Sequence, residues 1–345
     1  MSLVLHRTAW PDADQMMWNA LRKQAGPLDD RGALAHLRQT SCNTLELRYA
    51  RWMKWLETTD PDAFSLPPEE RATLARIQDW LDALSHTKPM SQLMFIDGVL
   101  RVLRAAVPDK DWTMQRRLLK RLKHAAGRGD PARKRGRILS SAVLLNAGLA
   151  HADSATVPNP LRRMIRQRDG MMIALLALLP IRRRAFCALA LGQSVYVNDD
   201  EILISLSEEM TKTGVPWEAA VPDQVATPLR RYIAEVRPAL LTRGNQCHDI
   251  LWVGKRGEIM GQDYIGARIG DLTLKLTGAR VSPHLFRDAA ATTLSRISPE
   301  SARLIRPVLA HSGFRTAERH YIHAQTIDAG RDYASLIKRL KKDRS

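Results

Sequence analysis

The sequence predicts a mainly α-helical chain that carries a small antiparallel β-sheet and is divided into two domains. Three observations support this fold class. The 345 residues, 45% of them hydrophobic, are enough to form two separate cores. Apolar side chains recur every three or four positions through most of the chain, which is the helical period. Alternation of period two is confined to residues 194–221, where short strands are expected.

Residues 1–35 contain one short apolar stripe, formed by Met16, Met17, Trp18 and Leu21, which indicates a short helix. Three roles fit such a segment: an arm, a cap on the following domain, or a contact with another protomer. The sequence leaves these alternatives open.

Residues 36–127 carry four helical stripes and are predicted to form a helical domain. The first helix follows the capping residues Ser41 and Thr44, and the second begins at Pro67 with acidic residues in its first turn. The third begins near Ser91. The apolar stripes of these three helices are formed by Leu45, Tyr49, Trp52, Met53 and Leu56, by Leu74, Ile77, Trp80, Leu81 and Leu84, and by Leu93, Ile96, Val99, Leu100 and Leu103.

A fourth helix is expected from Trp112 to Ala126, with Gly127 as its C-cap. The segment after this helix, GRGDPARKRGR, is rich in glycine, proline and arginine and has little to bury. We therefore place the boundary between the two domains at residues 128–137 and the second domain at 138–345.

Ten lysines and arginines but only one acidic residue, Asp130, lie between Met114 and Arg137. Such a run is often no more than a solvated face. Here it reaches into the linker between two domains of a strongly basic protein, so a stripe that follows a DNA backbone is the favoured interpretation. The predicted DNA-binding residues are Arg116, Arg117, Lys120, Arg121, Lys123, Arg133, Lys134, Arg135 and Arg137.

The second domain is predicted to mix helices with a small antiparallel sheet. Helices are expected at about 138–150, 159–179, 227–236 and 263–269 and again beyond Pro283, and strands at 194–197, 202–206 and 217–221. Lys212 lies in a turn between the last two strands.

The charge balance favours a polyanionic partner. The formal net charge is +17 and the pI is near 10.3, because 53 basic residues face 36 acidic ones. Nucleic acid is favoured over an acidic membrane surface. The longest apolar run, 171–181, is shorter than the roughly 20 residues that span a bilayer, and it suits a buried helix. The first ten residues lack the pattern of a signal peptide.

The three cysteines, Cys42, Cys187 and Cys247, are odd in number and widely spaced. This pattern indicates neither a disulfide framework nor a zinc site, and a reducing cytoplasm is the simplest expectation.

A set of side chains in the second domain contains the chemistry of metal-free DNA cleavage. Two arginines, a lysine and two histidines can surround one phosphate with positive charge and proton donors, and a tyrosine can attack it. The candidate catalytic residues are Arg182, Lys212, His284, Arg287, His311 and Tyr321. Arg183 and Arg184 compete with Arg182 for its role.

Pro283 suits the first turn of a helix with Ser282 as its cap. His284 and Arg287 are then three residues apart and share one helix face. Because a helix N-terminus favours an anion, we expect this turn to be a phosphate-binding position.

In these motifs the chain resembles the tyrosine recombinases, also called the phage integrase family. The family ends in the motifs His-x-x-Arg-His-x-x-Ala-Thr-x-Leu, Leu-Gly-His-Ser, and Thr-Thr followed by the nucleophilic tyrosine. Its Thr-Gly-Leu-Arg corresponds to Leu179 through Arg182, and its hairpin lysine corresponds to Lys212. The remaining matches are His284, Arg287, Ala291, Thr292 and Leu294, then Leu309, His311, Ser312, Thr316 and Tyr321, and the resemblance covers about residues 40–325.

The chain departs from the family pattern at several positions. Pro180 stands where the family has glycine, and Ala185 stands where an acidic residue is usual. Asp288 follows the second arginine where histidine is common, and Ala310 replaces the glycine before the second histidine.

The spacing of the nucleophile also differs. The family's tyrosine usually stands nine residues after its second histidine, a position held here by His320, and Tyr321 is one later. A turn extended by one residue near Gly313 accommodates this, so we predict Tyr321 as the nucleophile. Tyr333 is predicted instead to share the apolar stripe of a terminal helix with Leu336, Ile337 and Leu340.

The resemblance implies a two-domain DNA clamp, with a helical core-binding domain at 36–127 and an α+β catalytic domain at 138–345. It implies a site-specific recombinase or integrase that cuts and rejoins DNA through a 3′-phosphotyrosyl intermediate, without ATP, metal or other cofactor, to integrate or excise a mobile element. The implied partners are double-stranded DNA, a homotetramer on paired sites and accessory DNA-bending proteins, in the nucleoid of a bacterial cytoplasm and not at a membrane.

Two rival functions remain open on the sequence. A type IB topoisomerase-like enzyme would use similar chemistry to relax supercoils. A DNA-binding relative that has lost catalysis would fit Pro180, Ala185 and the shifted Tyr321. The amphipathic segment 328–340 can dock on a neighbouring protomer or pack on its own domain, and the sequence does not choose between them.

Overall fold

The computed structural model describes residues 2–26, 30–127, 136–153, 156–212, 214–297, 308, 330 and 332–339. The chain forms two compact units, Met1–Pro131 and Ala132–Ser345, here called unit 1 and unit 2. The division falls within the segment 128–137, which was expected as the domain boundary. Each unit has its own hydrophobic core.

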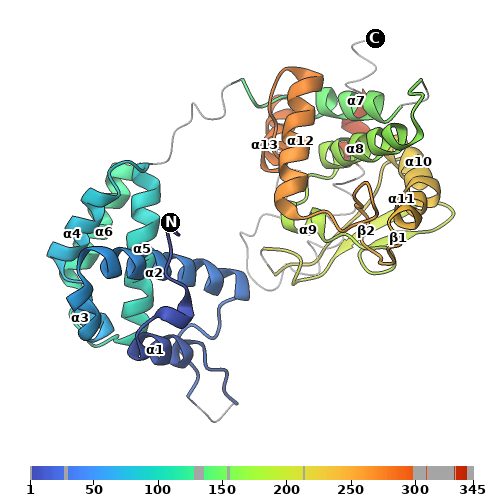
Figure 1. The fold of residues 1–345 in the computed structure, drawn as a ribbon. Helices are drawn as coiled ribbons and strands as arrows, with labels where there is room; N and C mark the ends of the chain where they lie inside the picture. The colour runs from blue at the N-terminus through green and yellow to red at the C-terminus, as the bar shows by residue number, and fades with distance from the viewer. Residues whose placement is uncertain are drawn as a thin grey trace. The chain divides into compact units, whose positions relative to one another are not determined.

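Unit 1 is helical throughout its described residues (Figure 1). Its elements are η1 (Arg7–Ala9), α1 (Asp12–Arg22), α2 (Gln39–Thr59), η2 (Pro61–Ser65), α3 (Pro68–Arg71), α4 (Leu74–Ala83), α5 (Pro89–Ala106) and α6 (Thr113–Ala126). Gly127 ends α6 with a φ of 58°, which confirms its prediction as the C-cap. Tryptophan dominates the core, since Trp18, Trp52, Trp80 and Trp112 are all fully buried.

The N-terminal residues belong to the core of unit 1. Trp18 of α1 is fully buried, and Trp10 packs edge-on against it with ring centroids 6.1 Å apart. Asp14, also buried, accepts a hydrogen bond from Tyr49 at 2.5 Å and pairs with Arg71 at 2.6 Å. The short helix predicted within residues 1–35 is therefore α1, and it is built into the core of the first unit.

The helix expected to begin at Pro67 is two helices. The chain leaves helical geometry after α3, and Thr73 then caps α4 by accepting a hydrogen bond from the backbone amide of Arg76. The break coincides with a tertiary contact: the side chain of Arg71 is buried, pairs with Asp14 of α1, and also donates to the backbone oxygens of Leu66 and Phe64. An uninterrupted helical stripe would not have directed this arginine inward.

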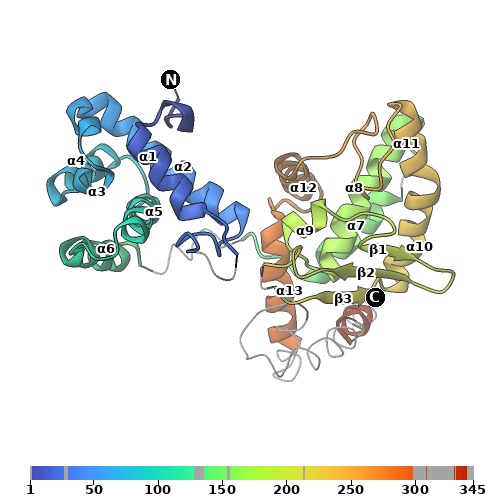
Figure 2. The ribbon, with the colours of Figure 1, turned by 90° about the horizontal axis from the view of Figure 1, so that it is seen from below.

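Unit 2 combines helices with one three-stranded sheet (Figure 2). Its elements are α7 (Ser141–Ala152), α8 (Pro160–Leu178), α9 (Arg183–Cys187), β1 (Val195–Val197), β2 (Ile202–Leu206), β3 (Trp217–Ala220), α10 (Asp223–Arg231), the π-helix η4 (Tyr232–Val236), α11 (Arg237–Arg243), α12 (Gln262–Thr277) and α13 (Pro283–Ile297). The strands are antiparallel in the order β1-β2-β3, with Val195 opposite Ile204 and Leu206 opposite Trp217. The fold class predicted from the sequence, mainly α with a small antiparallel sheet, is confirmed.

Helix α8 is the centre of unit 2. All its residues from Met171 to Leu178 are buried. Two glycines let α7 approach it closely, because a Cβ atom added at Gly170 would lie 2.4 Å from the backbone oxygen of Gly148. The end of this helix therefore provides a rigid support for the residues that follow it, including Arg182.

Two helices of unit 2 are longer than the sequence predicted. The helix expected at 227–236 begins at Asp223 and continues through η4 into α11. Pro228 lies inside α10, where it cannot donate a backbone hydrogen bond. The helix expected at 263–269 continues to Thr277, and Gly278 ends it in the left-handed conformation with a φ of 74°.

A helical segment at 332–339, here called the tail helix, packs on its own unit. Tyr333 is fully buried, and its hydroxyl donates to the backbone oxygen of Ala177 in α8 at 2.9 Å and also bonds to Ser141 at the start of α7. Ile337 is fully buried as well, and Leu336 packs beside it. This confirms the apolar stripe predicted for Tyr333, Leu336 and Ile337, whereas Leu340 lies outside the described residues.

Candidate active site: an arginine pair in unit 2

Arg182 stands at the junction between the central helix and α9. Helix α8 ends at Leu178, and Arg182 is the N-cap of the short helix α9 with extended backbone angles. Its side chain is half-buried, and this burial lowers the pKa of the guanidinium group from its ordinary value. Among the described residues, no carboxylate forms an ion pair with Arg182.

Arg287 approaches the same place from α13. Its side chain is 6% exposed, and its Nη1 donates a 2.7 Å hydrogen bond to the backbone oxygen of Pro180. Burial, and in addition the charge of Arg182, lower the pKa of Arg287 to about 10, while the charge of Asp288 opposes both effects. The positive charge of Arg182 therefore acts on Arg287.

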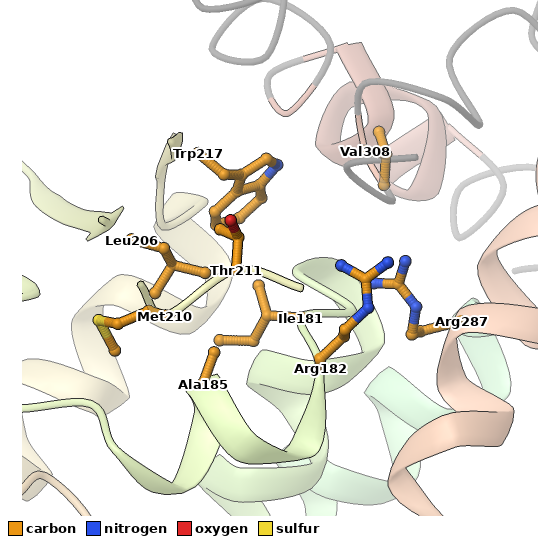
Figure 3. Close-up of a pocket in the computed structure, with 9 residues that line it drawn as sticks. All are labelled: Ile181, Arg182, Ala185, Leu206, Met210, Thr211, Trp217, Arg287 and Val308. Atoms are coloured by element: carbon orange, nitrogen blue, oxygen red, sulfur yellow. The ribbon is translucent and has the colours of Figure 1, made fainter. Parts of the chain in front are cut away.

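One pocket brings the two arginines together. Figure 3 shows their side chains lying next to each other at its edge, with the guanidinium groups turned the same way. Apolar side chains form the rest of the wall. The lining residues are Ile181, Arg182, Ala185, Leu206, Met210, Thr211, Trp217, Arg287 and Val308.

The three consecutive arginines have different surroundings. Arg183 is exposed and pairs with Asp263 of α12 at 3.3 Å. Arg184 is exposed too, and it donates to the backbone oxygen of Glu209. Only Arg182 of the three lines the pocket with Arg287, which favours it for the role that the sequence left contested.

Lys212 is exposed in the connection between β2 and β3, as expected for a turn. It is not itself a lining residue, but Thr211 immediately before it is 4% exposed and lines the pocket. The lysine is therefore attached directly to the wall of the arginine pocket.

Of the two histidines and the predicted nucleophile, the structure describes only His284. His284 lies in the first turn of α13, as predicted, but its side chain is exposed and does not line the pocket, whereas Arg287 is buried. His311 and Tyr321 lie outside the described residues. Val308, three positions before His311, is buried and lines the pocket.

Tyr333 does not compete with Tyr321 for the role of nucleophile in this structure. Burial raises the pKa of the Tyr333 hydroxyl, although its hydrogen bond with Ser141 opposes this effect. The hydroxyl is enclosed between α7 and α8, and it lines no part of the arginine pocket.

The predicted DNA-binding residues on α6 form an exposed basic surface. Arg116, Arg117, Lys120, Arg121 and Lys123 are all exposed, while Leu118, Leu119 and Leu122 pack against the core of unit 1. This arrangement leaves the basic face of the helix accessible.

The remaining predicted DNA-binding residues have mixed outcomes. Arg137 is partly buried and donates from Nε and Nη2 to the backbone oxygen of Arg280, at 3.1 and 3.0 Å. Arg133, Lys134 and Arg135 lie outside the described residues.

Sequence reasoning missed most of the pocket wall. Thr211, Met210 and Trp217 come together with the arginines only because the β2–β3 connection folds over α9. A signal was available for Thr211, since it adjoins Lys212. Trp217, expected as the start of a strand, gave no sign of a place in a site.

Two kinds of feature are absent from the part of the chain that the structure describes. It contains no group of three or more histidine, cysteine or acidic side chains that could hold a metal ion. Its helices do not combine the length and apolar character needed to cross a membrane. The three cysteines are unpaired, with Cys42 and Cys187 buried and Cys247 exposed.

The pocket has the chemistry of a phosphate-binding site. Two guanidinium groups held side by side can each offer paired donors to the oxygens of a phosphodiester. The sequence comparison then identifies the family: the model of the phage integrase family matches residues 155–327, and this chain belongs to that family. A search of curated proteins by sequence found no significant match.

Solved structures share the fold. Two complexes of the XerH site-specific recombinase with its difH substrate, one post-cleavage and one pre-cleavage, both have 12% sequence identity and a TM-score of 0.55. The post-cleavage complex matches 83% of this chain and 78% of that chain, and the pre-cleavage complex 89% and 79%. A lambda integrase tetramer bound to a Holliday junction has 15% identity and a TM-score of 0.49, over 90% of this chain and 76% of that chain.

Family and fold together give the class of enzyme. The protein is a tyrosine-type site-specific recombinase that acts in DNA recombination.

Proposed function

We propose that this recombinase cleaves and rejoins DNA at a specific site through a 3′-phosphotyrosyl intermediate and serves the integration or excision of a mobile element. The observation that carries the proposal is the arginine pair, because Arg182 and Arg287 line one pocket and the charge of one lowers the pKa of the other. Two like charges held together in a partly buried site repel each other. A bound anion would remove that repulsion.

The pair suits the two non-bridging oxygens of the scissile phosphate. At neutral pH both guanidinium groups remain charged, since the pKa of Arg287 is still about 10. Negative charge grows on these oxygens in the transition state, and forked donors oriented in advance stabilise it better than a single ammonium does.

The chemical step is proposed as follows. The hydroxyl of Tyr321 attacks phosphorus while His284 accepts its proton, and the bond between phosphorus and the 5′-oxygen breaks. Lys212 gives a proton to the departing 5′-oxygen, and His311 donates a hydrogen bond to the phosphate. The products are a 3′-phosphotyrosyl ester and a free 5′-hydroxyl, and attack by a 5′-hydroxyl reverses the step.

The proposed partner is double-stranded DNA, held as in a clamp by both units. The exposed basic face of α6 supports this, as does the net charge of +17. The XerH structures are complexes with a DNA substrate, which supports DNA as the partner. We include a homotetramer on paired sites in the proposal. Accessory DNA-bending proteins and a place in the bacterial nucleoid belong to the same proposal.

A covalent trap tests the proposal. The substrate is a duplex nicked next to the cleavage point, so that the short 5′-hydroxyl fragment diffuses away and the protein stays attached to DNA. We expect an adduct with the parent protein and with His320→Ala, and none with Tyr321→Phe. An adduct that persists in Tyr321→Phe refutes the nucleophile, and absence of any adduct with the parent reduces the protein to a DNA-binding relative.

Strand transfer separates recombination from relaxation. We expect the trapped protein to join its DNA to the 5′-hydroxyl of a second duplex. If it reseals only its own nicked strand and relaxes supercoils, the topoisomerase-like alternative holds instead.

A further inference from the structure

Arg184 connects the helix that follows Arg182 to the connection that carries Lys212. It lies on α9, two residues after Arg182, and its Nη2 donates to the backbone oxygen of Glu209. Glu209 lies in the β2–β3 connection, three residues before Lys212. One exposed side chain thus links the elements that bear two of the proposed catalytic residues.

The connection between Glu209 and Lys212 is itself well held. The backbone amides of Met210 and Thr211 both donate to the oxygen of Ser207, at 3.1 and 3.2 Å, and the Thr211 hydroxyl donates to the oxygen of Glu208 at 3.1 Å. Thr211 is buried in the pocket wall. Because hydrogen bonds within this turn fix its shape, a contact that fixes Glu209 also fixes the backbone position of Lys212.

The neighbouring arginine provides a contrast. Arg183 pairs with a carboxylate, that of Asp263 on α12, at 3.3 Å. Arg184 instead donates to a neutral backbone oxygen, that of Glu209, on the segment that holds Lys212. Both side chains are exposed, so neither is required to fill the core.

We propose that Arg184 is a positioning residue for Lys212: it fixes the β2–β3 connection against α9, so that the ammonium group of Lys212 reaches the leaving 5′-oxygen. The inference rests on the proposed function, in which Lys212 is the general acid. Arg184 itself is not assigned a contact with the phosphate.

A sulfur substitution isolates this role. In normal DNA the bond between phosphorus and the 5′-oxygen breaks, and that oxygen takes the proton of Lys212. When sulfur replaces the bridging 5′-oxygen, the bond between phosphorus and sulfur breaks instead, and the group leaves as a thiolate, because a thiol has a much lower pKa than an alcohol. On the sulfur substrate, a variant that has lost the general acid or misplaced it should therefore still form the adduct at close to the parent rate. A variant that has lost phosphate binding or the nucleophile should remain slow.

The experiment measures the rate of adduct formation in single turnover at saturating protein, with nicked substrates that carry either oxygen or sulfur at the 5′ position. The proteins are the parent, Lys212→Ala, Arg184→Ala, Arg184→Lys, Arg183→Ala and the double variant Arg184→Ala with Lys212→Ala. Thermal melting of each variant checks that the fold is retained.

We expect Lys212→Ala to lose on the order of 10²-fold on the oxygen substrate and to approach the parent rate on sulfur. In Arg184→Ala the rate of adduct formation on the oxygen substrate should fall on the order of 10-fold, because the ammonium group of Lys212 is then misplaced. On the sulfur substrate its rate should return toward that of the parent. Arg184→Lys, which can still donate to the Glu209 oxygen, should stay near the parent. Arg183→Ala should keep the parent's ratio of sulfur to oxygen rates.

The double variant should be no slower on oxygen than Lys212→Ala alone, since residues that act as a unit do not add. The inference is overturned if Arg184→Ala cleaves the oxygen substrate at the parent rate, or if it is equally slow on both substrates while Lys212→Ala recovers on sulfur. If Lys212→Ala itself fails to recover on sulfur, the general-acid assignment fails and the positioning role fails with it. If the parent protein forms no adduct with either substrate, the proposed function itself is rejected.

Discussion

The guanidinium group of Arg287 lies 2.7 Å from the backbone oxygen of Pro180, to which its Nη1 donates a hydrogen bond. Pro180 is buried and stands two residues before Arg182, so one short turn after α8 sets the positions of both arginines. Because α8 is buried from Gln167 to Leu178, the positions of both arginines are tied to a helix in the core of unit 2.

Arg182→Ala should separate activity from stability. We expect the rate of covalent adduct formation to fall by about 10²- to 10³-fold, as for loss of a preorganised donor. The free energy of unfolding should be unchanged or higher, because Arg287 would no longer face a second positive charge and its pKa, now about 10, would rise. Single-turnover trapping and urea titration measure the two quantities. A clear loss of stability would instead assign Arg182 a structural role.

His151 should make unit 2 sensitive to mild acid. The side chain is 8% exposed, and burial lowers its pKa to about 4, with Arg166 adding to the effect and Asp169 opposing it. In the unfolded chain the pKa is near 6.5. Between about pH 6.5 and pH 4 this histidine binds a proton in the unfolded state but stays neutral in the folded state. The free energy of unfolding therefore falls as pH is lowered, by up to about 1 kcal/mol per pH unit.

Urea titrations at several pH values, with hydrogen exchange of the α8 amides as the probe, measure this dependence. In His151→Gln the slope between pH 6.5 and 4 should be shallower than in the parent. His86→Gln, which changes an exposed histidine of unit 1, serves as the control and should keep the parent's slope. Equal slopes in all three proteins would contradict the prediction.

Tyr333→Phe should loosen the tail helix without preventing cleavage. The variant loses a buried hydroxyl that bonds to Ala177 and Ser141, which should lower the free energy of unfolding by about 1 to 3 kcal/mol. Hydrogen exchange in residues 332–339 should accelerate, while the covalent adduct still forms. Loss of the adduct, in a variant that melts as a folded protein, would reopen the choice of nucleophile.

The basic face of α6 should determine how DNA binding depends on salt. Replacing both Arg116 and Lys120 with alanine should weaken binding. It should also make the negative slope of log affinity against log salt shallower by about 1 to 2, if each side chain contacts one phosphate. Adduct formation at saturating protein should not change. Lys88→Ala, an exposed lysine of unit 1 outside this face, is the control, and an equal effect there would indicate nonspecific attraction only.

The sequence was sufficient where local patterns decide structure. The strands at 202–206 and near 195 and 217, the helix end at Gly127, and the start of α13 at Pro283 were all predicted within one or two residues. Alternation, capping residues and proline act over a few positions. Their signals therefore need no knowledge of the rest of the fold.

Features set by distant contacts could not be predicted. The break after Arg71 depends on its pairing with Asp14, 57 residues away. The choice among the three arginines depends on where Asp263, Glu209 and Arg287 lie. The sequence motif indicated which residue types belong to the site, but only the packing of α9, α13 and the β2–β3 connection shows which of them meet.

The burial of Tyr333 links the completion of unit 2 to the order of synthesis. This residue bonds to positions 156 and 192 residues earlier in the chain, and Ile337 follows it into the same core. A ribosome therefore makes both arginines of the pocket well before it makes the side chains that close the space beside α7 and α8. Until residue 337 emerges, a nascent chain lacks the side chains of Tyr333 and Ile337 that complete this core.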